Sequence, residues 1–139
     1  MSNQAEIPTP LDAAQVTQLI RGRRSMQPVL FEPGCPVPDA LVRELLENAT
    51  WAPTHKRTEP WHFVVFAGAG RQKLADFQAE LYRTTAGDKF QPAKLEKMTN
   101  NPLLSSHVIA IGLKRNPEVP EVEEVAAVAC AVQNCTSRP

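Results

Sequence analysis

The first apolar pattern of the chain has the spacing of a helix. Thr9 is suited to the N-cap position, Pro10 to the first helical position and the acid Asp12 to the third. Gly22 is a signal for the end of a helix. The pattern therefore predicts a helix up to Gly22 with one apolar face, made of Leu11, Val16, Leu19 and Ile20.

A second helix is predicted between two prolines. It begins at Pro38 and Asp39, and Pro53 stops it. Its polar residues Arg43, Glu44 and Glu47 are expected to face water. The opposite face is an apolar stripe at helical spacing, made of Leu41, Leu45, Leu46 and Ala49.

Two continuous apolar runs predict buried strands. They are WHFVVFAG at residues 61–68 and HVIAIGL at residues 107–113. Both contain β-branched or aromatic residues and lack the alternation of a half-exposed strand. Between them, residues 71–83 have a helical pattern, with Leu74, Phe77 and Leu81 on the inward face.

The remaining segments are a polar stretch and a final helix. Residues 84–106 contain Pro92 and Pro102 and predict a surface loop with one short helix. A helix is expected from about Glu121, with a packed face of Val125, Val128, Ala129 and Val132. The order helix, helix, strand, helix, strand, helix predicts an α+β fold, an α/β sandwich, in a single domain over residues 1–139.

Composition narrows the class of protein. The 139 residues are 42% hydrophobic and 22% charged, as expected for one globular domain. Fifteen basic and fifteen acidic residues cancel, so no net field would attract nucleic acid or an anionic membrane. No apolar run approaches the ~20 residues that span a bilayer, and the N-terminus lacks a secretion signal. A cytoplasmic protein is expected.

The cysteines and histidines do not form a recognisable framework. Three cysteines without a CxxC pair argue against disulfides and against a zinc site. The three histidines are scattered, and no two have the spacing of helical metal ligands. No metal site is expected.

Arg23, Arg24 and Ser25 place two guanidinium groups and a hydroxyl within three residues. A guanidinium can donate two parallel charge-assisted hydrogen bonds, so this cluster suits a phosphate monoester. The alternative is a solvated basic helix end that complements the helix dipole. The residues alone leave both interpretations open.

The segment WAPTHKRTEPWHF, residues 51–63, carries different chemistry. His55, Lys56 and Arg57 offer hydrogen-bond donors, while Trp51 and Trp61 offer flat apolar faces. Such a loop could hold a ligand. Alternatively, its tryptophans pack on the core and its cations point into water.

Taken together, these motifs resemble the nitroreductase family of flavin mononucleotide (FMN) enzymes. The resemblance lies in a helix that runs into RRS, a later helix that ends in AP, and then HK and PWHFVV at the start of a strand. APTHKRTEPWHF is similar to the small, compact branch of the family, and LLSSHVIAIGL and EEVAAVACAVQN continue the likeness from about Val16 to Asn134. The resemblance implies a nitroreductase-like fold with a central mixed sheet flanked by helices.

The resemblance also implies a homodimer with FMN at each subunit interface. Arg23, Arg24 and Ser25 would hold the phosphate and ribityl end of the flavin, and His55 would reach the flavin from the partner subunit. The position of Trp51 is also a flavin contact, although it is usually basic in relatives. A tryptophan there could stack on the flavin but could not form an ion pair.

The implied reaction is a ping-pong transfer of electrons. NADH or NADPH would reduce FMN, and a nitroaromatic, quinone or similar acceptor would then take the electrons. The flavin carries this chemistry, and the sequence shows no nucleophile–base pair, so no residue is assigned as catalytic.

The family domain normally continues past Asn134, so the resemblance implies that this chain lacks the C-terminal part. An inactive remnant, either a binding module or a poorly folding fragment, is therefore the alternative function. The helix pattern up to Asn134 has no glycine C-cap, and the chain then ends in CTSRP. A shifted reading frame after Asn134 and a genuine or artificial short end both stay open.

Overall fold

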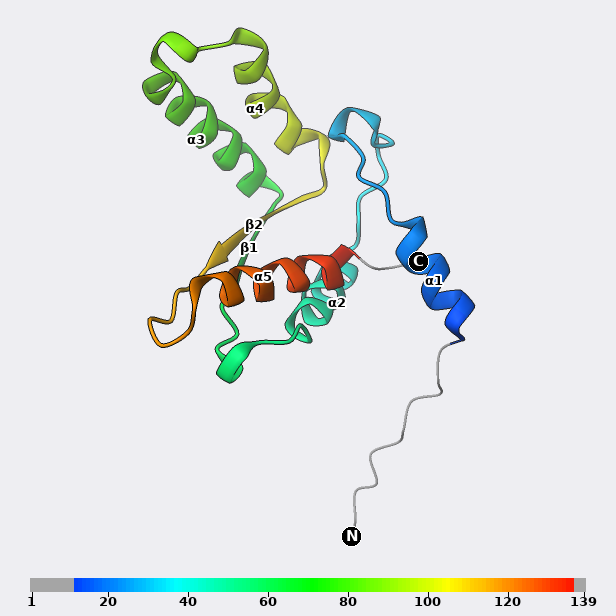
Figure 1. Ribbon diagram of the computed structural model, residues 1–139. Helices are drawn as coiled ribbons and strands as arrows, with labels where there is room; N and C mark the ends of the chain where they lie inside the picture. The colour runs from blue at the N-terminus through cyan, green and yellow to red at the C-terminus, as the bar shows by residue number, and fades with distance from the viewer. Residues whose placement is uncertain (1–11, 137–139) are drawn as a thin grey trace.

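The computed structural model of the chain describes residues 12–136. Its elements are α1 (Ala13–Gly22), η1 (Pro28–Leu30), α2 (Asp39–Thr50), η2 (His55–Arg57), β1 (Trp61–Ala67), α3 (Ala69–Thr85), η3 (Gly87–Lys89), α4 (Pro92–Leu104), β2 (His107–Leu113) and α5 (Glu121–Thr136), where η denotes a short 3-10 helix. Helices α3 and α4 form one pair, α2 and α5 form another, and the two strands connect them (Figure 1). The predicted α+β class is confirmed.

The contact between α2 and α5 is made by small residues. Ala49 of α2 and Ala131 of α5 are completely buried, and Ala52 lies beside them. Half-buried Trp61, Phe63 and Cys135 pack around this cluster. Alanines allow two helix backbones to approach closely, so the cluster sets the distance between α2 and α5.

The two strands pair antiparallel along their full length. Trp61 lies opposite Leu113 at one end of the ladder, and Ala67 lies opposite His107 at the other. Within residues 12–136 the sheet has these two strands and is antiparallel, which differs from the mixed sheet that the resemblance implied.

The prediction that both strands are buried is wrong. Val64, Val65 and Ile111 are exposed. A continuous apolar run becomes a buried strand only when both faces of the sheet are covered. In the described chain, α3 and α5 cover the strands at only a few positions.

Helix α3 turns a different face inward from the predicted one. Its buried residues are Ala75, Ala79 and Tyr82, whereas Phe77 and Leu81 are exposed. Which face of α3 is buried depends on the elements packed against it, and these are mainly α4 and also β1. The prediction for Phe77 and Leu81 is therefore wrong.

The segment predicted as a loop with one short helix contains the 13-residue helix α4. Pro92 occupies the first turn of α4, where its missing N–H costs nothing, and Pro102 is buried near the other end. Tyr82 anchors the connection from α3, because its hydroxyl donates to the carbonyl of Lys89 (3.2 Å) and accepts from the amide of Gln91 (2.9 Å).

Helix α1 begins later than predicted. Asp12 is its N-cap and accepts from the Ala14 amide (3.2 Å), while the side chain of Gln15 accepts from the Asp12 amide. Asp12 is thus a cap and does not occupy the third helical position. The predicted start at Thr9 and Pro10, with Leu11, lies outside the described residues. Gly22 ends α1 as predicted.

The final helix begins at Glu121, as predicted, and continues through Thr136. Its buried face differs from the predicted one, since it consists of Glu124, Ala127 and Ala131, while Val125 is exposed. The alanine side of α5 packs on α2, and this contact, which the pattern alone does not contain, selects the face.

Replacement of Ala131 by Leu should destabilise the chain, because the added methylenes have no space between α2 and α5. We expect the free energy of unfolding to fall by about 1–3 kcal/mol, the usual cost of overpacking. Ala129→Leu, on the exposed side of the same helix, is the control. Urea unfolding followed by circular dichroism measures both, and equal midpoints would contradict the packing.

The three cysteines should react with iodoacetamide in a defined order. Cys35 and Cys130 are exposed, whereas Cys135 packs against the alanine cluster, and burial raises the pKa of its thiol. The thiolate is the reactive form, so Cys135 should be alkylated last near neutral pH. A time course by peptide mass spectrometry tests the order. In urea the three rates should converge, and equally fast labelling of Cys130 and Cys135 in the folded chain would contradict it.

Candidate functional site

The loop between α2 and β1 has an unusual backbone. Lys56, Arg57 and Glu59 have φ values of 51°, 54° and 45°, in the left-handed region that residues other than glycine rarely adopt. Each such residue costs on the order of 1–3 kcal/mol and persists only when surrounding contacts impose it. Ala52 and Pro60, both buried, fix the two ends of this loop. Residues 51–60 are called the left-handed loop below.

A side-chain hydrogen bond attaches the left-handed loop to α5. His55 Nδ1 is hydrogen-bonded to Glu123 Oε2, and both side chains are 44% exposed. The two residues are separated by 68 positions, so no sequence pattern could have identified the pair. In the same loop, the Thr58 hydroxyl is buried and has no hydrogen-bond partner among the described residues.

A buried carboxylate holds the start of α5. Glu124, 1% exposed, accepts from the Asn116 amide (3.0 Å) and from the Arg115 guanidinium. Arg115 also donates to the Val119 carbonyl (3.4 Å). This cluster joins the turn that follows β2 to the first turn of α5, and it fixes the position from which Glu123 reaches His55.

The predicted phosphate anchor lies on the exposed segment after α1. Arg23 Nη1 donates to Ser25 Oγ (3.2 Å), so these two side chains are brought together. Arg24 Nη1 instead donates to the carbonyls of Arg21 and Arg23 (2.9 Å for the latter). Arg24 is thus bonded to the end of α1, and both guanidiniums retain further N–H groups on the surface.

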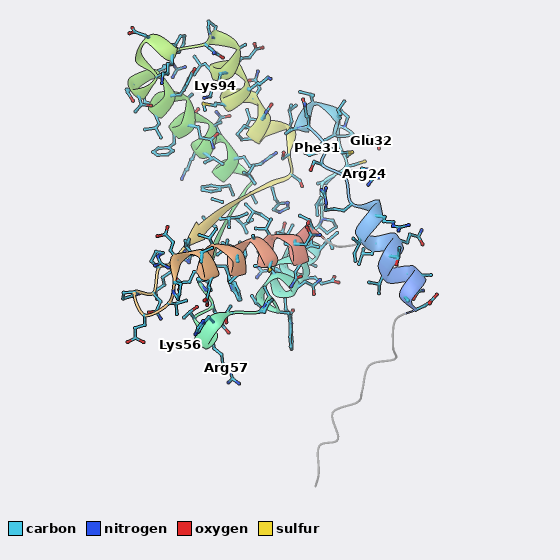
Figure 2. All side chains as sticks on the ribbon, viewed as in Figure 1. Arg24, Phe31, Glu32, Lys56, Arg57 and Lys94 are labelled. Carbon is cyan, nitrogen blue, oxygen red and sulfur yellow. The ribbon has the colours of Figure 1, made fainter. Side chains whose placement is uncertain are left out.

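The structure does not bring all the predicted site residues together within one chain. Figure 2 shows Arg24 beyond the end of α1, whereas Lys56 and Arg57 lie at the far end of the α2–α5 pair. Trp51 is the C-cap of α2, and the residue is 80% exposed. One chain thus presents two separate exposed groups of donors and an exposed indole.

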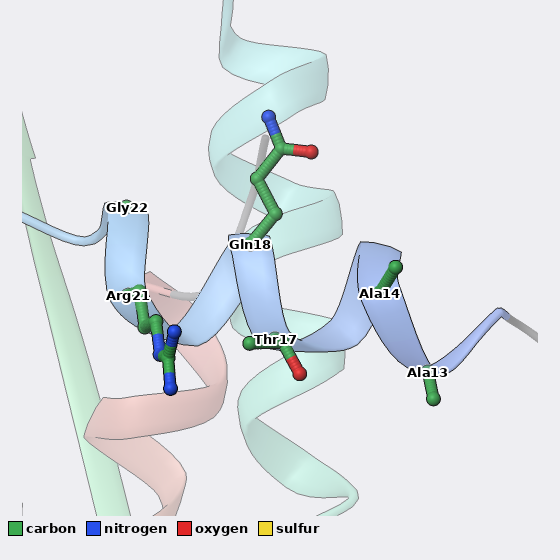
Figure 3. Close-up of a pocket in the computed structure, with 6 residues that line it drawn as sticks. All are labelled: Ala13, Ala14, Thr17, Gln18, Arg21 and Gly22. Atoms are coloured by element: carbon green, nitrogen blue, oxygen red, sulfur yellow. The ribbon is translucent and has the colours of Figure 1, made fainter.

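Two hollows elsewhere do not combine these groups. One lies on α1, and the described residues that line it all belong to α1 and include Arg21 (Figure 3). In the other, His107 pairs with Asp39 (2.9 Å) and with Ser106 (3.1 Å), and Arg71 donates to the carbonyls of Leu103 (3.2 Å) and Ser105. In the second cleft these bonds join α2 to β2 and α3 to the end of α4.

Neither a metal-binding cluster nor a membrane-spanning helix is found among the described residues. Across residues 12–136, no group of three or more His, Cys, Asp or Glu side chains is placed to hold a metal ion. In the same part of the chain, no helix is long and apolar enough to cross a membrane.

Comparison with known proteins identifies the class. The model of the nitroreductase family matches residues 20–136, which is most of the chain. The chain belongs to the nitroreductase family, as the sequence motifs indicated. The matched range includes the two arginines, the left-handed loop and Glu123.

Individual relatives agree with this assignment. YfhC of Bacillus subtilis strain 168, which carries a provisional NAD(P)H nitroreductase name, is 29% identical over 118 residues, covering 84% of this chain and 59% of YfhC. A nitroreductase-like protein of Bacillus cereus superposes with a TM-score of 0.68 at 26% identity, covering 94% of this chain and 65% of that one. A Desulfovibrio desulfuricans protein, provisionally a nitroreductase and solved with FMN, gives 0.64 at 26%, covering 95% and 62%. The chain therefore spans less than two thirds of each of these proteins.

Proposed function

We propose that this protein is an FMN-dependent oxidoreductase that transfers electrons from NADH or NADPH, by a ping-pong mechanism, to a nitroaromatic, quinone or similar acceptor. The observation that carries the proposal is the exposed cluster of Arg23, Arg24 and Ser25 within a nitroreductase domain. The related D. desulfuricans protein was solved with FMN, which supports the cofactor. We further propose that residues 1–139 form one nitroreductase-like domain.

The residues present fit FMN. The two guanidiniums and the Ser25 hydroxyl can donate several hydrogen bonds to a phosphate, and the geometry of a guanidinium suits paired bonds to its oxygens. The exposed face of Trp51 suits stacking on a flat ring. When bound, FMN would supply the redox chemistry by accepting a hydride from the nicotinamide and passing electrons to the acceptor. The chain would bind, orient and shield it.

We propose that the complete site forms between two copies of the chain. Within one chain Arg24 lies away from Lys56 and Arg57 of the left-handed loop (Figure 2), which supports a site completed by a second copy. The segment that carries the arginines also exposes apolar side chains, including Ile20 at 63%, Val29 at 66% and Leu30 at 69%. A second copy that covers these side chains would bring its own His55 and Trp51 to the flavin.

One observation distinguishes the oxidoreductase from the alternative function, an inactive remnant. A purified chain that is yellow, or that becomes yellow when FMN is added, with a flavin absorbance band and reduction by NADH or NADPH, supports the oxidoreductase. A chain that stays colourless with added FMN would exclude the flavoenzyme for these 139 residues.

Replacement of Arg23 or Arg24 by Ala should weaken FMN binding. We expect a loss of about 1.5–3 kcal/mol, the range for hydrogen bonds to charged groups. Arg43→Ala, which removes an exposed arginine from α2, is the control for net charge and should leave the affinity unchanged. Quenching of flavin fluorescence measures the three dissociation constants. The anchor assignment is wrong if both variants bind FMN as tightly as the parent.

A mixed dimer should separate the two halves of the site. With Arg24→Ala on one chain and His55→Ala on the other, one flavin site should be intact and the other doubly damaged. FMN titration of the heterodimer, purified with two different tags, should show one tight and one very weak site. Two sites of equal, reduced affinity would mean that Arg24 and His55 act on the same flavin from one subunit.

A further inference from the structure

We infer that Glu123 is a positioning residue, which fixes the direction and tautomer of the His55 imidazole so that Nε2 is the ring nitrogen presented to the flavin. The contact between His55 Nδ1 and the Glu123 carboxylate carries this inference. The inference rests on the proposed function in one respect, namely that His55 Nε2 faces FMN.

The chemistry of the contact sets the tautomer. An ionised carboxylate has no proton to donate, so His55 Nδ1 must be the donor in this hydrogen bond. The Nδ1 proton leaves a lone pair on Nε2 when the ring is neutral. Within residues 12–136, His55 Nε2 has no hydrogen-bond partner, so this acceptor remains available to a ligand.

The loop alone could not provide this orientation. His55 precedes Lys56 and Arg57, whose left-handed φ values of 51° and 54° persist only where surrounding contacts impose them. The fixed point is instead the first turn of α5, where Glu124 is buried against Arg115 and Asn116. Orientation therefore passes from the end of β2, through Glu124, to Glu123 and then to His55.

An exposed ion pair offers a competing explanation, in which the contact is only a minor surface interaction. Such pairs contribute little to stability. The two explanations differ in what the Glu123→Ala change alters. Positioning predicts a changed imidazole with an unchanged unfolding midpoint, whereas an incidental contact predicts that the imidazole is the same with and without Glu123.

The test compares Glu123→Ala with Glu123→Gln and Glu121→Ala. Gln retains an oxygen that accepts from Nδ1, so it should rescue the effect. Glu121→Ala removes the same charge from the same turn of α5 and controls for the helix dipole. Long-range ¹H–¹⁵N correlation spectra of the histidine rings, recorded without FMN, should show His55 protonated at Nδ1 in the parent, Glu123→Gln and Glu121→Ala. Glu123→Ala should shift the ring toward the Nε2–H tautomer.

Flavin binding provides the second readout. We expect Glu123→Ala to raise the dissociation constant for FMN roughly 2- to 10-fold, the range of one neutral hydrogen bond. Glu121→Ala should leave this constant unchanged, and Glu123→Gln should restore the affinity of the parent. Identical His55 spectra in Glu123→Ala and the parent would overturn the inference, as would a tautomer shift without any change in FMN affinity. If the tautomer shifts but the parent binds no FMN, positioning by Glu123 is supported and the proposed function is wrong.

Discussion

The close approach of α2 and α5 is the constraint on which the rest of the structure depends. Ala49 and Ala131 are completely buried where the helices meet, and Ala52 extends the contact to the end of α2. A larger side chain at this point would separate the helix axes. Because the left-handed loop leaves α2 here and Glu123 reaches it from α5, the same contact brings the two halves of the His55–Glu123 pair within bonding distance.

The candidate binding groups lie on two exposed segments that differ in how they are anchored. The left-handed loop is fixed at both ends by buried residues and attached to α5, which is the support that a strained backbone requires. The arginines, in contrast, lie on a segment whose neighbours Val29 and Leu30 are exposed. In the proposed dimer, a flavin would join the left-handed loop of one subunit to the arginines of the other, and covering the apolar side chains would favour that association.

The exposure of apolar side chains also shows where the sequence patterns predicted burial wrongly. The apolar runs at residues 61–68 and 107–113 were correctly predicted as strands, since β-branched and aromatic side chains favour an extended backbone whatever covers them. Their burial was predicted wrongly, because burial depends on which elements lie over the two faces of the sheet. The burial of Phe77 was predicted wrongly for the same reason, because α3 buries Ala75 and Ala79 and leaves the aromatic ring on the outside.

The sequence by itself determined the local elements, the family and the residue types of the site. Helix stops at Gly22 and before Pro53, and the start of α5 at Glu121, follow from backbone chemistry that operates within a few residues. Only the tertiary structure decided which helix faces are buried, that the polar segment forms a helix as long as residues 92–104, and that His55 meets Glu123. The physical reason is the distance along the chain over which each kind of interaction acts. Capping, turn and propensity signals act between near neighbours in the chain, whereas burial and a hydrogen bond across 68 residues depend on how the helices pack.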